Sequence, residues 1–391
     1  MTTYVPNDLD WFIEGSLKRG FTDVLPIKEY ESQFIKKTDI RVMIYNVSGA
    51  GAVSFTNINL ANAFGKSSGI NVHPTFATDE KLESLGHTAS LDGYITTDAA
   101  FEQGAEICIL TGFLRNKDVH ITQDAAYQTV ANVFNKAKEH CPIVLAMCGS
   151  AEVAAYENHG MESTIYDQKN LGVFPFAKAD AEIRDPSRKD YISSALNTLT
   201  HMPMSRSRNL SDAMLMSNDI IVQLYNHEAG VGIARERNNQ THYVLGHPEN
   251  EDISLPLEQI RDWKNFAEGK IDKAPNDAKN ILNNIHLENK FFAFKHECMK
   301  TREHNNNNPN DKKAAPEFDI NTIRPFLENN WREGFAAYSN GIISQLFKML
   351  QDGSAYDIAP KYKPAEGSGI LVPDHVQQKW KQNQPQALEQ A

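Results

Sequence analysis

The chain has few cysteines, no long apolar run and no excess of positive charge, and each absence excludes a class of protein. Four cysteines in 391 residues do not make a disulfide framework, and none belongs to a C-x-x-C pair. No apolar run approaches the roughly 20 residues that a membrane-spanning helix needs. A net charge of -11 argues against nucleic acid or an anionic membrane surface as the main partner.

The remaining composition is that of a soluble globular protein, with 41% hydrophobic and 23% charged residues. The N-terminal sequence MTTYVPNDLDWF lacks the basic and apolar segments of a secretory signal. Together with the small number of cysteines, these features predict a cytoplasmic protein that binds neither nucleic acid nor membrane.

Apolar runs of strand length alternate with helical patterns in the first part of the chain. Buried strands are expected at residues 40–47, 70–76, 105–110 and 143–147. This alternation predicts an α/β fold, with a mostly parallel sheet flanked by helices. Ligands of such sheets bind beyond the carboxyl ends of the strands, where Gly49, Thr111 and Cys148 fall.

Composition divides the chain into five expected segments. They are an N-terminal extension (1–38), an α/β catalytic domain (39–268), a polar insertion (269–318), a C-terminal helical segment that packs on the core (319–360) and a loosely ordered tail (361–391). The insertion is polar and contains four consecutive asparagines at 305–308, which predicts a flexible or long surface segment.

The sequence PIVLAMCGSAEVAAYENHG has the pattern of a nucleophile turn. The apolar run ends at Cys148, Gly149 follows, and a helical pattern begins. A helix N-terminus stabilises a thiolate, which is the reactive form of cysteine. Gly149 permits a tight turn and offers its N–H to an oxyanion. The alternative is a buried structural cysteine at a strand end.

A second strand pattern ends in the turn Gly-His-Pro-Glu, which contains His247 and Glu249. Acyl chemistry on a cysteine needs a base to take the thiol proton and a carboxylate to orient that base. Cys148, His247 and Glu249 therefore form a candidate catalytic set. The alternative is a polar turn that only ends a strand.

Other motifs carry weaker signals. The turn SGAGA after the first strand lacks the third glycine and the acidic residue of a dinucleotide site, so a plain turn is favoured. Arg206, Arg208 or Arg261 could bind a substrate carboxylate, or be solvated surface residues. His296, Glu297, Cys298 and His304 lack metal-ligand spacing, so no metal site is predicted.

Several segments, in chain order, resemble the homoserine O-acyltransferase family of methionine biosynthesis, of the homoserine O-succinyltransferase type. They are IRVMIYNV, ILTG, VLAMCGSAEVAAYENHG, PMSRSR, LGHPEN and WREGFAAYSNGIISQLF. The resemblance implies a class I glutamine-amidotransferase-like fold with extra C-terminal helices. It places Cys148 on the catalytic cysteine, His247 on the catalytic histidine and Glu249 on its partner.

The resemblance also implies the substrates. Arg261 falls on the position that binds the amino-acid carboxylate. Further substrate-binding positions are predicted at Arg206, Ser205, Thr111 and Gly112, and at Asn116 in the loop that follows. It implies acetyl-CoA or succinyl-CoA as co-substrate, no bound cofactor, small-molecule substrates and a homodimer.

The chain departs from the family pattern around the acyl group. Lysines after the first strand are replaced by Ala50 and Gly51, and the tryptophan after the nucleophile is Gly149. The Thr-Gly-Ala-Pro loop reads TGFLRNKD, and a histidine is replaced by Met204. The sequence therefore predicts the reaction more firmly than the acyl group.

We interpret the sequence as that of an acyltransferase that forms an acyl-enzyme on Cys148 and passes the acyl group to homoserine or a related amino acid. Two alternatives stay open. One is a glutaminase- or amidase-like thiol hydrolase, and the other is a non-catalytic binding protein on the same scaffold.

Overall fold

The computed structural model describes residues 3–5, 14, 16, 18, 24–26, 39–47, 50–65, 71–79, 94–116, 118–179, 191–281, 285–327, 329–364 and 374–383. The strands are β1 (Thr3–Val5), β2 (Val24–Pro26), β3 (Asp39–Tyr45), β4 (Asn71–Thr78), β5 (Ile95–Thr96), β6 (Ile107–Leu110), β7 (Ile143–Met147), β8 (Thr164–Lys178), β9 (Leu199–Asn209), β10 (Ile220–Asn226), β11 (Gly230–Glu236) and β12 (Thr241–Val244). The helices are α3 (Ala50–Gly65), α5 (Thr97–Gln103), α6 (Tyr127–His140), α7 (Gly149–His159), α8 (Tyr191–Ala195), α9 (Ser211–Met216), α10 (Ser254–Ala267), α11 (Ile285–Asn307), α12 (Arg332–Asp352), α13 (Ser354–Ile358) and α14 (Asp374–Asn383). Short 3-10 turns are η1 (Ile121–Gln123), η2 (Ile320–Thr322) and η3 (Arg324–Phe326).

The described strands form one sheet in the order β2-β1-β4-β3-β6-β7-β12-β11-β10-β8-β9, with β5 beside β4. The pairings from β2 to β12 are parallel, and those from β12 to β9 are antiparallel. The prediction of an α/β fold with a mostly parallel sheet is confirmed. The antiparallel part begins at β12, which itself pairs in parallel with β7, the strand that leads to Cys148.

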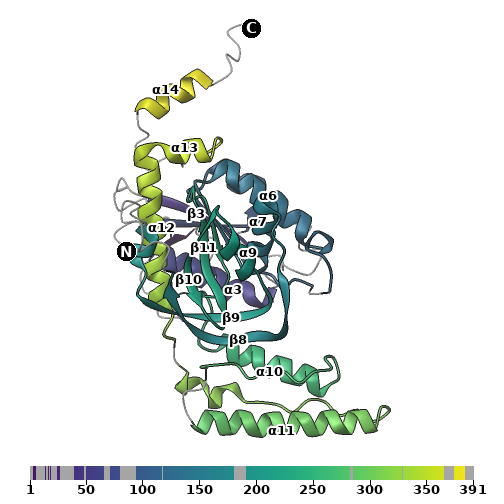
Figure 1. Ribbon diagram of the computed structural model, residues 1–391. Helices are drawn as coiled ribbons and strands as arrows, with labels where there is room; N and C mark the ends of the chain where they lie inside the picture. Colours follow the sequence, from purple (N-terminus) through teal and green to yellow (C-terminus); the bar gives the residue numbers. More distant parts are fainter. Residues whose placement is uncertain are drawn as a thin grey trace.

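Alternating side chains of the central strands face two separate cores. In β3, Ile40, Val42 and Ile44 belong to a core shared with α3 and α12. Met43 and Tyr45 belong to a core shared with α6 and α7 on the opposite face. Figure 1 shows the sheet between these two helical layers. Helices cover both faces of the sheet. A site can therefore form at the carboxyl ends of the parallel strands, which the helices leave open.

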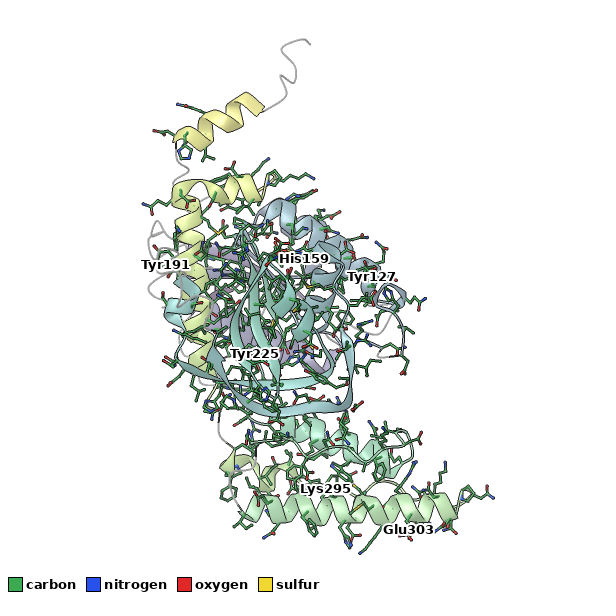
Figure 2. All side chains as sticks on the ribbon, in the orientation of Figure 1. Tyr127, His159, Tyr191, Tyr225, Lys295 and Glu303 are labelled. Carbon is green, nitrogen blue, oxygen red and sulfur yellow. The ribbon has the colours of Figure 1, made fainter. Side chains whose placement is uncertain are left out.

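The polar insertion at 269–318, predicted to be a flexible or long surface segment, contains the 23-residue helix α11. Its apolar side chains Leu287, Phe291, Phe294 and Cys298 pack on α10 in a core that includes Trp263. Their spacing of three and four residues is that of a helix face. The sequence did not predict this helix, because the polar composition of the segment reflects the exposed face of α11. Figure 2 shows Lys295 and Glu303 on α11, at the end of the molecule away from α14.

The C-terminal region is helical, as predicted, but its boundaries differ. The 3-10 turns η2 and η3 precede α12, which packs on α8 and α3 and supplies Phe335, Tyr338 and Ile342 to the core. The tail, expected to be loosely ordered, contains α14 at 374–383, where Val376 is 4% exposed. Within the described part of the chain, no helix is both long enough and apolar enough to cross a bilayer.

Candidate active site

Cys148 lies in a strained turn between the buried strand β7 and helix α7. Its backbone angles are φ 45° and ψ -115°, in a region that non-glycine residues rarely adopt. Such a conformation costs about 1–3 kcal/mol and is found at functional sites. Its N–H donates to the Val244 carbonyl at 2.9 Å, and its carbonyl accepts from the Ala151 N–H at 3.0 Å. These bonds hold the turn, which confirms the predicted strand–turn–helix pattern and leaves the thiol partly exposed.

His247 and Glu249 form an orienting pair beside this cysteine. Nδ1 of His247 lies 2.8 Å from Oε1 of Glu249, whose residue is 4% exposed. The His247 ring and the Cys148 side chain both border Gly112, so the imidazole lies beside the thiol. Burial by itself lowers the pKa of His247, but the charges and hydrogen bonds of Cys148 and Glu249 outweigh it and raise that pKa well above 6.5. The three residues of the candidate catalytic set therefore lie together, and their arrangement favours an imidazolium next to the thiol.

Residues outside the motif hold the His-Pro-Glu turn in place. The His247 N–H donates to the Pro203 carbonyl of β9 at 2.8 Å. Asn59 of α3 donates through Nδ2 to the Glu249 carbonyl at 2.7 Å, and Trp331 donates through Nε1 to the Asn250 carbonyl at 2.9 Å. Sequence reasoning missed Asn59 and Trp331, because their roles depend on contacts with distant parts of the chain.

Gly112 and Gly149 bring the loop after β6 into contact with the nucleophile turn. A Cβ on Gly112 would lie 2.9 Å from Cβ of Cys148 and 3.4 Å from Cε1 of His247. A Cβ on Gly149 would lie 2.5 Å from the Phe113 carbonyl oxygen. The small residue at 149 is therefore required by the close approach of Phe113. Gly149 also opens α7, where backbone N–H groups lack partners within the helix.

A family model described as homoserine O-succinyltransferase matches residues 22–332 of this chain. The chain belongs to the homoserine O-succinyltransferase family. Homoserine O-succinyltransferase from Cardiobacterium hominis is 26% identical over 260 residues, which cover 65% of this chain and 71% of that protein. Homoserine O-acetyltransferase from Lachnoclostridium phytofermentans is 22% identical over 259 residues, which cover 66% and 75%. Relatives named for succinyl and for acetyl transfer thus occur at similar identity.

Among solved structures, a glutamine amidotransferase from Thermotoga maritima aligns at 8% identity over 78% of this chain and 97% of that chain. Its TM-score is 0.40.

Ser205 and Arg261, both predicted by the family resemblance, share one carboxylate. Glu258 Oε1 accepts from Ser205 Oγ at 2.8 Å and from Arg261 Nη2 at 3.0 Å. Lys169 of β8 donates to the same oxygen at 2.6 Å and to Asp262 at 2.8 Å. Lys169 was not predicted, because an isolated lysine in a strand carries no motif. This polar cluster adjoins the active-site turn, since Ser205 lies two residues along β9 from the carbonyl that binds His247.

The other predicted binding residues lie apart from that cluster. Arg206 faces the opposite side of β9 from Ser205, is 5% exposed, and donates to the Val231 carbonyl at 3.4 Å. Thr111 Oγ1 accepts from the Val47 N–H at 2.9 Å. Asn116 accepts the Asp118 N–H at 3.0 Å within its own exposed turn. Of these three, Thr111 is nearest the nucleophile, because its carbonyl accepts from Ser150 Oγ on α7 at 2.7 Å.

Two departures from the family pattern have different structural settings. Met204 is fully buried beneath the catalytic turn, where a Cβ on Gly246 would lie 2.9 Å from its sulfur atom. The methionine therefore fills core space. Ala50 and Gly51 open α3, whereas Ser48 and Gly49, which complete the predicted glycine-rich turn, lie outside the described residues.

Proposed function

We propose that this protein transfers an acyl group from acyl-CoA to the hydroxyl of homoserine through a thioester on Cys148. The observation that carries this proposal is the cysteine in a strained strand-to-helix turn, beside a histidine that a buried glutamate orients. Family membership supports the acyl transfer and the acceptor.

The first half-reaction forms the acyl-enzyme. The Cys148 thiolate attacks the thioester carbonyl, and backbone N–H groups, including that of Gly149, stabilise the resulting oxyanion. When the tetrahedral intermediate collapses, the bond to the CoA sulfur breaks and His247 gives its proton to that sulfur. The products are acyl-Cys148, free CoA and a neutral His247.

The second half-reaction regenerates the ion pair. Neutral His247 takes the proton of the homoserine hydroxyl as its oxygen attacks the acyl-cysteine carbonyl. Collapse expels the Cys148 thiolate and releases O-acylhomoserine, so that His247 is again protonated beside the thiolate. In both steps Glu249 keeps the imidazole oriented and stabilises its charged form.

Recognition of homoserine is assigned to the polar cluster next to the catalytic turn. Arg261 and Lys169 are cations that a substrate carboxylate can bind, and Ser205 is a neighbouring donor. The carboxylates of Glu258 and Asp262 are suited to a substrate ammonium group. As the family resemblance implies, the proposal includes no bound cofactor and a homodimer in the cytoplasm.

Discharge of the acyl-enzyme separates this proposal from thiol hydrolysis. Protein acylated with succinyl-CoA or acetyl-CoA would be freed of excess donor and mixed with homoserine, with serine or with buffer alone. We expect homoserine to remove the acyl group at least ~100-fold faster than buffer. Equal rates with and without homoserine would contradict the proposal and favour hydrolysis.

Glu249→Gln is expected to slow acylation by about 10²-fold or more, because the imidazolium loses its charged partner. The carboxylate contributes to the raised pKa of His247. Without it that pKa falls, so the proton needed by the CoA sulfur is lost at lower pH. The alkaline limb of the acylation profile should therefore move to lower pH. A profile of unchanged shape would refute this role for Glu249.

Gly149→Ala is expected to reduce acylation by roughly 10²-fold, because the added Cβ would displace the Phe113 carbonyl and the adjoining turn. Gly160→Ala at the other end of α7 is the matched control. It strains a residue at φ +61°, but its Cβ meets no atom within 4 Å. The control should lower the melting temperature and leave acylation unchanged. Equal effects of the two substitutions on acylation would contradict the account.

A further inference from the structure

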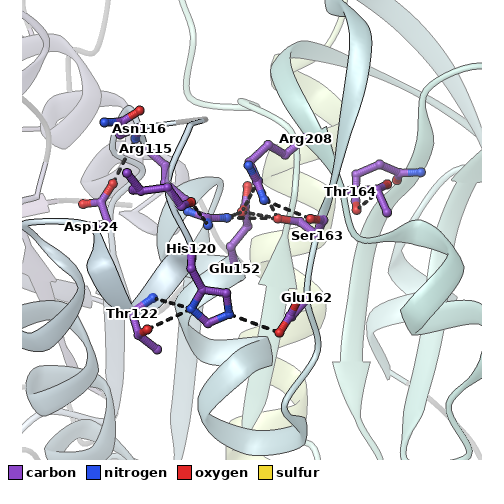
Figure 3. Close-up of polar contacts among 12 residues, drawn as sticks. Arg115, Asn116, His120, Thr122, Asp124, Glu152, Glu162, Ser163, Thr164 and Arg208 are labelled. Carbon is purple, nitrogen blue, oxygen red and sulfur yellow. Dashed lines mark hydrogen bonds and ion pairs between the residues drawn. The ribbon is translucent and has the colours of Figure 1, made fainter.

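Glu152 is a buried carboxylate close to the nucleophile that the proposed mechanism does not use. It lies four residues after Cys148, one turn along α7, and is 7% exposed. Its Oε2 accepts from Arg115 Nη1 at 2.6 Å and from Ser163 Oγ at 2.6 Å, and lies 3.6 Å from Arg208 Nε. Figure 3 shows these side chains converging from separate segments of the chain. A carboxylate so enclosed fixes the groups that donate to it.

Arg115 is the partner that links this carboxylate to the loop after β6. It is 9% exposed, and besides Glu152 it donates to Ser163 Oγ at 3.0 Å and to the Val119 carbonyl at 3.1 Å. Its loop neighbour Leu114 is 83% exposed. The guanidinium therefore anchors this part of the loop to α7.

The anchored loop is also the one that contacts the reacting residues. Phe113, two residues before Arg115, places its carbonyl against Gly149. Gly112, the residue before it, packs against Cβ of Cys148 and Cε1 of His247. A small movement of Arg115 would thus change the distance between the loop and the nucleophile.

We infer that Arg115 and Glu152 are positioning residues that hold the Gly112–Phe113 backbone against Cys148 during acylation. The inference rests on the proposed function, because it concerns the step that forms the acyl-enzyme. Neither side chain acts on the substrate in this account. Ser163 and Arg208 complete the arrangement, since Arg208 donates through Nε to Ser163 Oγ at 2.8 Å and through Nη2 to the Ser163 carbonyl at 3.0 Å.

The test compares two reactions of the same thiol in Glu152→Gln. Acylation by succinyl-CoA or acetyl-CoA depends on the loop that shapes the oxyanion site, whereas alkylation by iodoacetamide does not. We expect the acylation rate to fall by ~10–100-fold and the alkylation rate to change less than threefold. Ser163→Ala, which removes one bridging hydroxyl and keeps the ion pair, should give a smaller loss in the same direction.

Glu236→Gln is the matched control on the far end of α7. The Glu236 carboxylate is also largely buried, and it accepts from Asn158 Nδ2 at 2.5 Å and Tyr243 OH at 3.0 Å and lies 3.1 Å from His159 Nε2. It should lower the melting temperature without changing acylation.

Two outcomes would overturn the inference. The first is acylation of Glu152→Gln at the wild-type rate. The second is an equal loss of acylation and alkylation in this variant, which would indicate a merely structural role. Absence of acylation in the wild-type protein would instead refute the proposed function, and the inference with it.

Discussion

Replacing Cys148 by alanine is expected to abolish acyl transfer, lowering kcat by about 10⁴–10⁶-fold. The substitution removes the atom that forms the thioester, and no other cysteine can replace it, because Cys108, Cys141 and Cys298 are buried. Activity would be measured as O-acylhomoserine formation with each acyl-CoA. The folded structure should persist, since alanine keeps the backbone bonds of the turn.

Cys298→Ala is the matched control for this prediction. Cys298 packs in the α10–α11 core, away from the catalytic turn, so its loss should leave kcat unchanged. Retention of more than a few per cent of activity in Cys148→Ala would exclude the cysteine as the nucleophile. It would then favour direct transfer between the two substrates.

His247→Ala is expected to slow both half-reactions by about 10²–10⁴-fold, the usual contribution of a general acid–base group. The variant loses the proton donor for the CoA sulfur and the base for the homoserine hydroxyl. Rapid-quench measurement of acylation, and of discharge by homoserine, would show the two losses separately. Added imidazole should restore part of each rate by occupying the space of the missing ring.

His242→Ala provides a comparison on the same strand-and-turn segment. His242 is fully buried in β12, and its Nε2 lies 3.1 Å from the Asn239 carbonyl. This variant is expected to lose stability while acylation, measured per folded molecule, stays within threefold. A loss of acylation in His247→Ala that is no larger than in His242→Ala would contradict the assigned role of His247.

The central part of the fold was predictable because its signals are local. The apolar run before Cys148, the glycine after it and the helical pattern beyond define the turn without help from distant residues. The parallel strands β3, β6 and β7 were predictable for the same reason, since each is buried on both faces and is therefore almost continuously apolar. The parallel strands β1 and β2 were not predicted. The Gly-His-Pro-Glu turn followed from its position at a strand end.

The missed features depend on pairings between distant segments. Arg115 and Glu152 are 37 residues apart, and nothing in either neighbourhood marks them as partners. Lys169 reaches the cluster through the antiparallel pairing of β8 and β9, whose mixed polar and apolar residues hide the strand pattern. Helix α11 was missed because its apolar face is narrow and the exposed residues dominate its composition.

Intact-protein mass spectrometry after brief incubation with acetyl-CoA and, separately, succinyl-CoA tests the account most directly. The account predicts a mass increase of one acyl group with at least one donor, absent in Cys148→Ala and removed by homoserine. The donor that gives the adduct would also identify the acyl group. No adduct with either donor, or an adduct that persists in Cys148→Ala, would contradict the acyl-enzyme on Cys148.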